Sequence, residues 1–242
     1  MKKILLLLMF VLFFTTLYPA KFPKLIGRVN DYANILNSQE ESSLNLLLKE
    51  LEDKTSAQVV LLTIETLDGD TIEDYAIRLT EQRDWKIGQK DLDNGVILLV
   101  SIRERKLRLE VGYGLEGTLT DLKSNYIIRK MIVPSFKSGD YYAGILRGLT
   151  MVSGIISKES DISPEDLKQF KKKKDETPSI PHIIFIIIFF FFILPSFFGK
   201  RRGGSSIFWG GGFGGGSSSG GGFGGFSGGG GSFGGGGASG GW

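Results

Sequence analysis

The sequence predicts an α/β domain, in which a small mixed β-sheet is flanked by helices in a three-layer-like sandwich. Two β-branched, leucine-rich runs, at residues 58–64 and 96–102, are typical of buried strands. An amphipathic helix is predicted between them, so the three segments form a βαβ unit with parallel strands. A tight turn at residues 103–106 then leads into a third strand, residues 107–111, which we expect to pair antiparallel with the second.

Four helices are predicted from capping residues and apolar periodicity. The first begins at a capping box in residues 38–41, and the second begins at Thr71. Asp121 begins a third helix that reaches about Ile132, and a fourth follows Asp140. Their apolar sides face the predicted sheet and include Leu44, Leu48, Leu51, Ile72, Tyr75, Leu79, Ile145 and Leu149.

The segments outside this domain, residues 27–157, predict export and membrane anchoring. Lys2 and Lys3 precede an apolar run at residues 4–14, which predicts a signal peptide over residues 1–20, cleaved after Ala20 or retained as an anchor. A charged linker, residues 158–180, contains a short helix that begins at Ser163. A second apolar run predicts one transmembrane helix over residues 181–198.

The tail, residues 199–242, consists largely of glycine and serine with scattered aromatic residues. Its apolar content is too low to offset chain entropy, which predicts disorder. Basic residues at 200–202 favour the inside, so we expect a periplasmic or extracellular domain and a cytoplasmic tail. The tail is either inert or a weak docking or self-association segment.

Composition excludes several kinds of chemistry. The chain has no cysteine, so disulfides, thiolate metal sites and cysteine nucleophiles are excluded. Its one histidine, His182, lies at the edge of an apolar run, which excludes a Ser-His-Asp triad in the domain. The net charge of +3 is small and its basic residues are interleaved with acidic ones, so nucleic acid is not an expected partner.

Acidic and glycine residues gather at two loops that the predicted hairpin would bring together. One is residues 91–95, before the second strand, and the other is residues 110–117, after the third. We expect the carboxylates of Asp31, Asp93, Glu110, Glu116 and Asp121 to converge there. Oxygen ligands suit calcium or magnesium. The alternative is a simple turn at residues 93–95, with Asp121 only favouring a helix N-terminus.

The glycines at 112, 114 and 117 also fit a G-x-G-x-x-G pattern. A dinucleotide site is not expected, because the pattern follows a late strand and the next helix leads to another helix.

These motifs together resemble the TPM domain family over residues 27–157. The resemblance rests on VNDYANIL at 29–36, WKIG at 85–88, DNGVILLV at 93–100 and EVGYGLEG at 110–117, followed by Thr120-Asp121, PSF at 134–136 and GDYY at 139–142. The signal peptide, single span and glycine-rich tail are similar to the bacterial YgcG-like branch of that family.

The resemblance implies an α/β sandwich on the outer side of a membrane. Relatives in thylakoids are linked to photosystem II repair, and some members are described as metal-binding acid phosphatases. By motif, it implies Asp31, Asp93, Asn94, Glu110 and Asp121 as metal or catalytic positions. The surrounding site loops carry Gly95, Gly112, Tyr113, Gly114 and Glu116.

Two functions follow as expectations. The first is a binding or maintenance module for envelope and membrane proteins, with a divalent cation as a structural clip. The alternative is a metal-dependent acid phosphatase that hydrolyses phosphomonoesters, in which the ion would polarise a phosphoryl oxygen and activate water.

Overall fold

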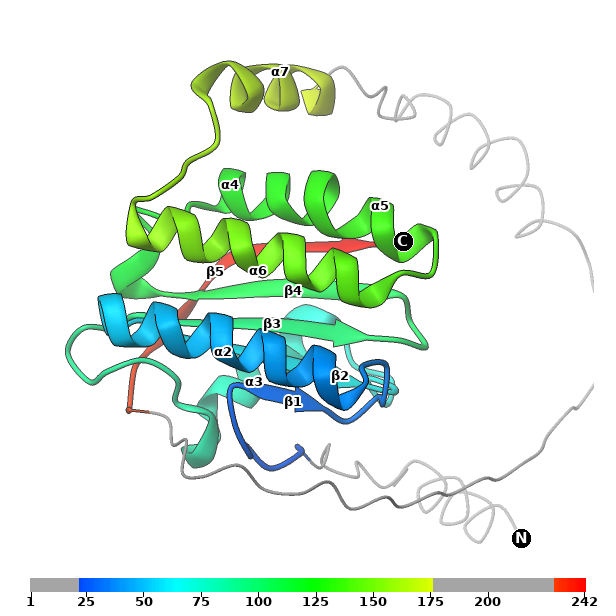
Figure 1. Cartoon of the computed structure of the whole chain (residues 1–242), viewed down its shortest axis with the longest axis vertical. Helices are drawn as coiled ribbons and strands as arrows, with labels where there is room; N and C mark the ends of the chain where they lie inside the picture. Colours follow the sequence, from blue (N-terminus) through cyan, green and yellow to red (C-terminus); the bar gives the residue numbers. More distant parts are fainter. Residues whose placement is uncertain (1–21, 176–228) are drawn as a thin grey trace, which may run out of the picture.

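The computed structural model describes residues 22–175 and 229–242, which form one β-sheet and the helices that cover it (Figure 1). The predicted signal peptide and transmembrane segment lie outside these residues. The helices are α2 (Ser38–Thr55), α3 (Ile72–Glu81), α4 (Asp121–Tyr126), α5 (Val133–Lys137), α6 (Tyr141–Ser157) and α7 (Pro164–Asp175). The strands are β1 (Val29–Asp31), β2 (Gln58–Ile64), β3 (Gly95–Ser101), β4 (Lys106–Gly112) and β5 (Phe233–Gly241).

The sheet is mixed, and its strands are hydrogen-bonded in the order β1-β2-β3-β4-β5. Strands β1, β2 and β3 are parallel, whereas β4 is antiparallel to both of its neighbours. The predicted parallel β2–β3 pair and the predicted β3–β4 hairpin are therefore confirmed. Strand β1 was not predicted, because it is only three residues long and its central residue, Asn30, is polar and buried.

The middle of the sheet is covered by helices on both faces. Helices α2, α4, α5 and α6 lie over one face and α3 lies over the other (Figure 1). Every residue of β2 and of β3 is buried, which explains why both read as continuous apolar runs in the sequence. The buried side chains form two clusters, one on each face of the sheet.

The helices begin close to where capping residues predict. Thr71 accepts a hydrogen bond from the Asp74 backbone N–H at the start of α3, as predicted. The capping box of α2 lies one residue earlier than predicted. Asn37 is the N-cap, and its partner Glu40 accepts a hydrogen bond from the Asn37 N–H at 2.8 Å. Asparagine caps as well as serine does, so the sequence alone did not separate the two positions.

The predicted third helix contains a change of helical pitch. Helix α4 passes into a π-helical turn, Ile127–Ile132, and then into α5. Pro134 stands just beyond this turn and has no N–H to donate to the fourth residue before it, so the regular ladder is interrupted there.

The prediction of a disordered tail is wrong for residues 229–242. This segment contains β5, which pairs with the whole length of β4, from Lys106↔Gly241 to Gly112↔Phe233 (Figure 1, red). The prediction considered only the apolar content of the tail itself. An existing sheet edge supplies hydrogen-bond partners and a packing surface, so a glycine-rich segment can be ordered by its docking.

This pairing constrains how the chain relates to a membrane. A chain that crosses a membrane once between α7 and β5 would place the domain and β5 on opposite sides, where they could not share a sheet. One crossing, a cytoplasmic tail and this intrachain sheet are therefore mutually incompatible. No helix within the described part of the chain is long and apolar enough to span a membrane, and residues 181–198 lie outside that part.

Candidate functional site

The loop before β3 and the loop after β4 meet at one end of the sheet, as the hairpin predicted. The Gly114 N–H donates to the Asp93 carbonyl oxygen at 3.0 Å. A Cβ atom at Gly112 would overlap that same carbonyl, and one at Gly114 would overlap the carbonyl of Leu92. Glycine at these two positions therefore allows the backbones of the two loops to pack directly together.

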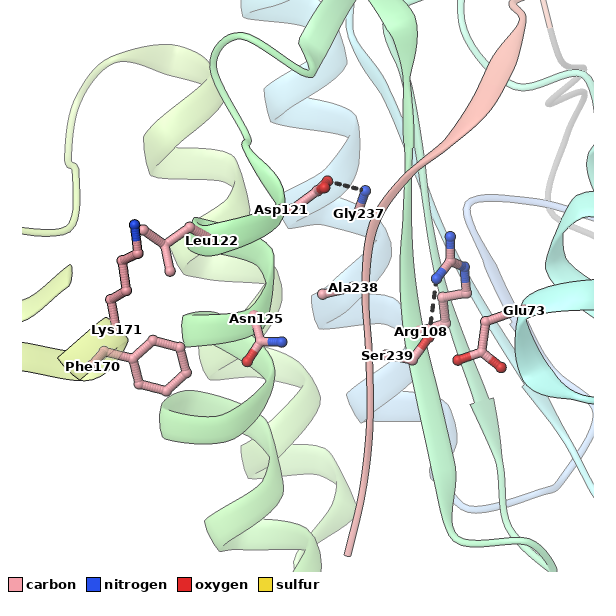
Figure 2. Close-up of a pocket in the computed structure, with 10 residues that line it drawn as sticks. All are labelled: Glu73, Arg108, Asp121, Leu122, Asn125, Phe170, Lys171, Gly237, Ala238 and Ser239. Carbon is pink, nitrogen blue, oxygen red and sulfur yellow. Dashed lines mark hydrogen bonds between the residues drawn. The ribbon is translucent and has the colours of Figure 1, made fainter. Parts of the chain in front are cut away.

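Strand β5 runs past this junction, and two predicted site carboxylates bind its backbone. The N–H of Ser232, just before β5, donates to Asp93 Oδ1 at 2.7 Å. Within β5, the Gly237 N–H donates to Asp121 Oδ1 at 2.7 Å (Figure 2). Asp121 is the first residue of α4, at the outer side of β5. Carboxylates from separate segments thus act as hydrogen-bond acceptors for one glycine-rich strand.

On the other side of β5, a buried ion pair also contacts the strand. Arg108 Nε lies 2.5 Å from Glu110 Oε2, and both side chains belong to β4. The same guanidinium donates through Nη1 to Ser239 Oγ at 3.0 Å and through Nη2 to the Gly235 carbonyl oxygen at 2.9 Å. Arg108 therefore binds its own strand and β5 with three different nitrogens, which the fixed fork of a guanidinium permits.

The electrostatics of this pair depend on its burial. Glu110 is fully buried, and burial raises the pKa of its carboxyl group, while the neighbouring Arg108 charge acts in the opposite direction. Glu73 of α3 lies close by. Burial would raise the pKa of Glu73, but the Ser239 hydroxyl and the charges of Arg108 and Lys106 together lower it.

Several glycines of β5 lie where a side chain would overlap the rest of the domain. Gly237 has φ +117°, and a Cβ atom there would overlap the carbonyl oxygen of Leu109. Similar overlaps would arise between Cβ atoms at other β5 glycines and the side chains of the domain, namely Gly234 with Tyr113, Gly236 with Glu116 and Gly240 with Ile128. Glycine at position 237 above all is therefore needed for close docking, because both its positive φ and a backbone carbonyl exclude a side chain there.

An aromatic cluster holds the far end of the segment. The Trp242 ring meets the Phe136 ring edge to face, with centroids 4.7 Å apart, and the Tyr141 ring at 6.0 Å. Its backbone N–H donates to the Arg105 carbonyl oxygen at 3.2 Å. Offset aromatic pairs of this kind add about 0.5–1.5 kcal/mol each to the burial of apolar area.

We call this surface the strand site: the β4 edge together with Asp93, Arg108, Asp121, Phe136 and Tyr141. A hollow of about 540 Å³ opens beside β5 within it (Figure 2). Figure 2 shows β5 between two groups of side chains, those of α4 and α7 on one side and those of β4 and α3 on the other. The lining residues are Glu73, Arg108, Asp121, Leu122, Asn125, Phe170, Lys171, Gly237, Ala238 and Ser239.

Asp31 does not join the other predicted site residues. It pairs with Thr63, which pairs with Val100 near the end of β3, whereas Asp93 precedes the start of β3. Five residues of strand, roughly 17 Å, separate the two levels of the sheet. The Asp31 carboxylate accepts hydrogen bonds from the Thr63 hydroxyl and from the Leu36 N–H. The predicted convergence of Asp31 with Asp93 is wrong, because parallel strands carry a strand-end residue and a strand-start residue to opposite ends of the sheet.

The Asn94 side chain is used in hydrogen bonds within the fold and does not face an open site. Its Oδ1 accepts from the Gln89 N–H at 2.8 Å, and its Nδ2 donates to the Ser56 carbonyl oxygen at 3.0 Å. The side chain is buried and ties the loop before β3 to the end of α2. Gly95 begins β3, and a Cβ atom there would overlap the Ile87 carbonyl. Both residues therefore shape the loop that presents Asp93.

The predicted cation ligands do not gather into a metal centre. Among residues 22–175 and 229–242, no three acidic or histidine side chains lie close enough together to hold a metal ion. Asp93 binds the N–H of Ser232, Asp121 binds the N–H of Gly237, and Glu110 is paired with Arg108. With β5 docked, this arrangement does not fit a calcium or magnesium ion.

The sequence analysis missed several residues of the strand site. Glu110 was predicted as a site residue but Arg108 was not, although the two occupy alternate positions of β4, which was a signal of a buried polar pair on one face. Trp242, Phe136 and Tyr141 gave no such signal, because their contacts join segments far apart in the chain.

Comparison with known proteins places the domain among recognised relatives. Residues 29–155 match the family model described as the TPM domain. The chain is similar to the N-terminal domain of a protein from P. gingivalis, with 28% identity and a TM-score of 0.51, covering 55% of this chain and 84% of that one. No curated protein matches the chain.

Two further solved structures are more distant. The BA42 protein of the psychrophilic bacterium Bizionia argentinensis is 19% identical, with a TM-score of 0.45, covering 54% of this chain and 88% of that one. The N-terminal domain of the cg2496 protein of Corynebacterium glutamicum is 15% identical, with a TM-score of 0.42, covering 59% and 86% of the two chains.

Proposed function

Because this chain belongs to the TPM domain family, we propose that its domain works as a binding module whose working surface is the strand site. The observation that carries this proposal is the docking of β5. A segment more than a hundred positions away in the sequence adds a strand to the β4 edge. Its N–H groups donate hydrogen bonds to Asp93 and Asp121, and its Ser239 accepts one from Arg108. Adding a strand to an exposed edge is a common way in which domains recognise extended peptides.

Each part of the site has a role in such binding. The backbone ladder of β4 supplies affinity that depends little on sequence. Asp93, Asp121 and Arg108 fix the register, because each meets one particular atom of β5. The aromatic pair Phe136 and Tyr141 receives an aromatic residue at the far end. Peptide recognition of this kind combines main-chain hydrogen bonds with pockets for particular side chains.

Hydrolysis of phosphomonoesters is less well supported by this geometry. That reaction would need grouped carboxylates facing an accessible substrate position, and Asp93 and Asp121 are instead occupied by β5 N–H groups. Glu110 is fully buried, so a substrate has no access to it as a general acid in this structure.

Attachment of the domain to a membrane and binding of a divalent cation are also proposals. The apolar runs and the tether support a domain held at a membrane surface, where membrane proteins offering extended segments would be its partners. A calcium or magnesium ion acting as a clip would require the carboxylates to be released from β5.

The experiment that tests this function compares strand docking with hydrolysis in the full-length chain. Hydrogen exchange followed by mass spectrometry should show protection of β4 and of residues 233–241. Trp242→Ala should increase exchange in both segments at least about threefold, because it removes the aromatic anchor. Ser232→Ala is the matched control, because Ser232 is exposed and its hydrogen bonds to the domain come from its backbone N–H and carbonyl groups, which alanine keeps.

A phosphatase assay could contradict the proposal. If the wild-type chain hydrolysed a chromogenic phosphate ester with calcium or magnesium, and Asp93→Asn and Asp121→Asn abolished that turnover, the binding-module proposal would fail in favour of the phosphatase.

A further inference from the structure

We propose that the strand site is a selective peptide-binding site that takes the glycine-rich strand of a second copy of this chain, in the same register as its own β5. The inference rests on the proposed function and adds to it the identity of the ligand and the rule that selects it.

The selection rule follows from the positions where β5 touches the domain. Gly237 must be glycine, because of its positive φ and because the Leu109 carbonyl oxygen occupies the place of a Cβ atom. Gly240 packs against Ile128 in a similar way. Ser239 accepts a hydrogen bond from Arg108, and Trp242 fills the aromatic cluster. A ligand therefore needs glycine, a small polar residue and an aromatic residue at fixed spacing.

The tail itself contains a near match that breaks this rule. Residues 213–222 read FGGGSSSGGG, and residues 233–242 read FGGGGASGGW. When the two are aligned, Ser217 stands where β5 has Gly237, and Gly222 stands where β5 has Trp242. The first change places a side chain against the Leu109 carbonyl, and the second removes the aromatic anchor. The rule therefore explains why residues 233–242, rather than residues 213–222, occupy the site.

A second copy can supply the strand because the docking contacts are all non-covalent and complete among the described residues. The hydrogen bonds that join residues 229–242 to Asp93, Arg108 and Asp121 link residues 116–139 positions apart. None of them depends on which chain carries residues 229–242, which is the condition under which identical elements exchange between protomers.

The chain's own strand competes with any incoming one. A tethered ligand acts at an effective concentration in the millimolar range when its linker spans the distance well, so it weakens apparent binding of a free peptide by about 10²-fold or more. Binding between copies should therefore be strong only when the resident strand has been weakened.

The test uses a labelled synthetic peptide of residues 229–242 and two forms of the full-length chain. The acceptor form carries Gly237→Val and Trp242→Ala, which disable its own strand while leaving residues 22–175 unchanged. Fluorescence anisotropy should show the acceptor binding the peptide about 10²-fold more tightly than the wild type does. A peptide of residues 213–222 should not bind, and Ser232→Ala should behave as the wild type.

Two results would overturn the inference. Equal binding of the peptide to wild type and acceptor would show that it binds elsewhere, and equal binding of the two peptides would refute the selection rule. An acceptor that shows the wild-type circular dichroism spectrum but does not bind the peptide would also refute it. In that last case, protection of β4 in the wild type would leave the proposed function standing, whereas absence of that protection would remove both.

Discussion

Arg108 and Glu110 show how one pair of side chains links the core to the docked strand. Both residues are almost fully removed from water: Arg108 is 7% exposed and Glu110 is 0% exposed. A buried pair of this kind gives little net stability compared with apolar residues, but losing one partner is strongly destabilising. The pair contributes instead to the register between β4 and β5, because the guanidinium also donates hydrogen bonds to Ser239 and Gly235 of β5.

Glu110 predicts a pH dependence of stability. Burial raises its pKa above the ordinary value of 4.5, so the folded state takes up a proton at a higher pH than the unfolded state does. This group's contribution to the free energy of unfolding is therefore fully present below pH 4.5 and is lost as the pH rises through the folded-state pKa. Glu110→Gln removes the titration.

Urea unfolding of the two proteins between pH 4 and pH 7 measures the effect. The free energy of unfolding of the wild type relative to Glu110→Gln should decrease as the pH rises. Glu65→Gln, at an exposed position, is the control for the loss of one carboxylate. A wild-type advantage that stayed constant or grew with pH would show that burial does not dominate the environment of Glu110.

At the scale of elements, the sequence predicted what depends on local pattern. Strands β2 and β3, the β3–β4 hairpin, and helices α2, α3, α6 and α7 all carry apolar periodicity or capping residues near their ends. Ser163, predicted to begin a short helix, accepts from the Asp166 N–H at the start of α7. The meeting of the loops around Asp93 and Gly114 followed from the hairpin in the same way.

Strand β5 could not be predicted from its sequence pattern, because pairing with β4 stabilises it and its own side chains do not. A run such as residues 234–237 has no side chains whose periodicity could indicate a strand. The shape of the β4 edge selects this segment. At position 237, for example, only glycine can lie so close to the Leu109 carbonyl oxygen. The predicted convergence of Asp31 with Asp93 failed for a different reason. The prediction assumed that the acidic residues of the TPM-like motifs all lie at one end of the sheet.

For the whole molecule, the docking of β5 leads to a prediction about any membrane crossing. The domain and residues 229–242 must lie on the same side, so we predict that a single crossing between them does not occur in the chain that forms this sheet. The absence of cysteine from the sequence makes this easy to test, because any introduced cysteine is the only thiol.

Single-cysteine labelling in intact cells provides that test. Lys137→Cys reports on the domain and Ser232→Cys reports on the tail, and both positions are exposed. A membrane-impermeant maleimide should label both variants, or neither, before the membrane is permeabilised. Labelling of Lys137→Cys alone would place the tail across the membrane and would rule out this sheet within one chain.

The central claim, that residues 229–242 form the edge strand of this sheet, is tested most directly by a disulfide trap. Lys106 and Gly241 are exposed and lie directly opposite each other in the β4–β5 ladder, within the spacing that a disulfide can bridge. The double variant Lys106→Cys with Gly241→Cys should form an intrachain disulfide under mild oxidation, detected by mass spectrometry. The pair Lys106→Cys with Gly221→Cys, which uses the equivalent position of residues 213–222, should remain reduced. Equal oxidation of both pairs, or of neither, would contradict a docked β5.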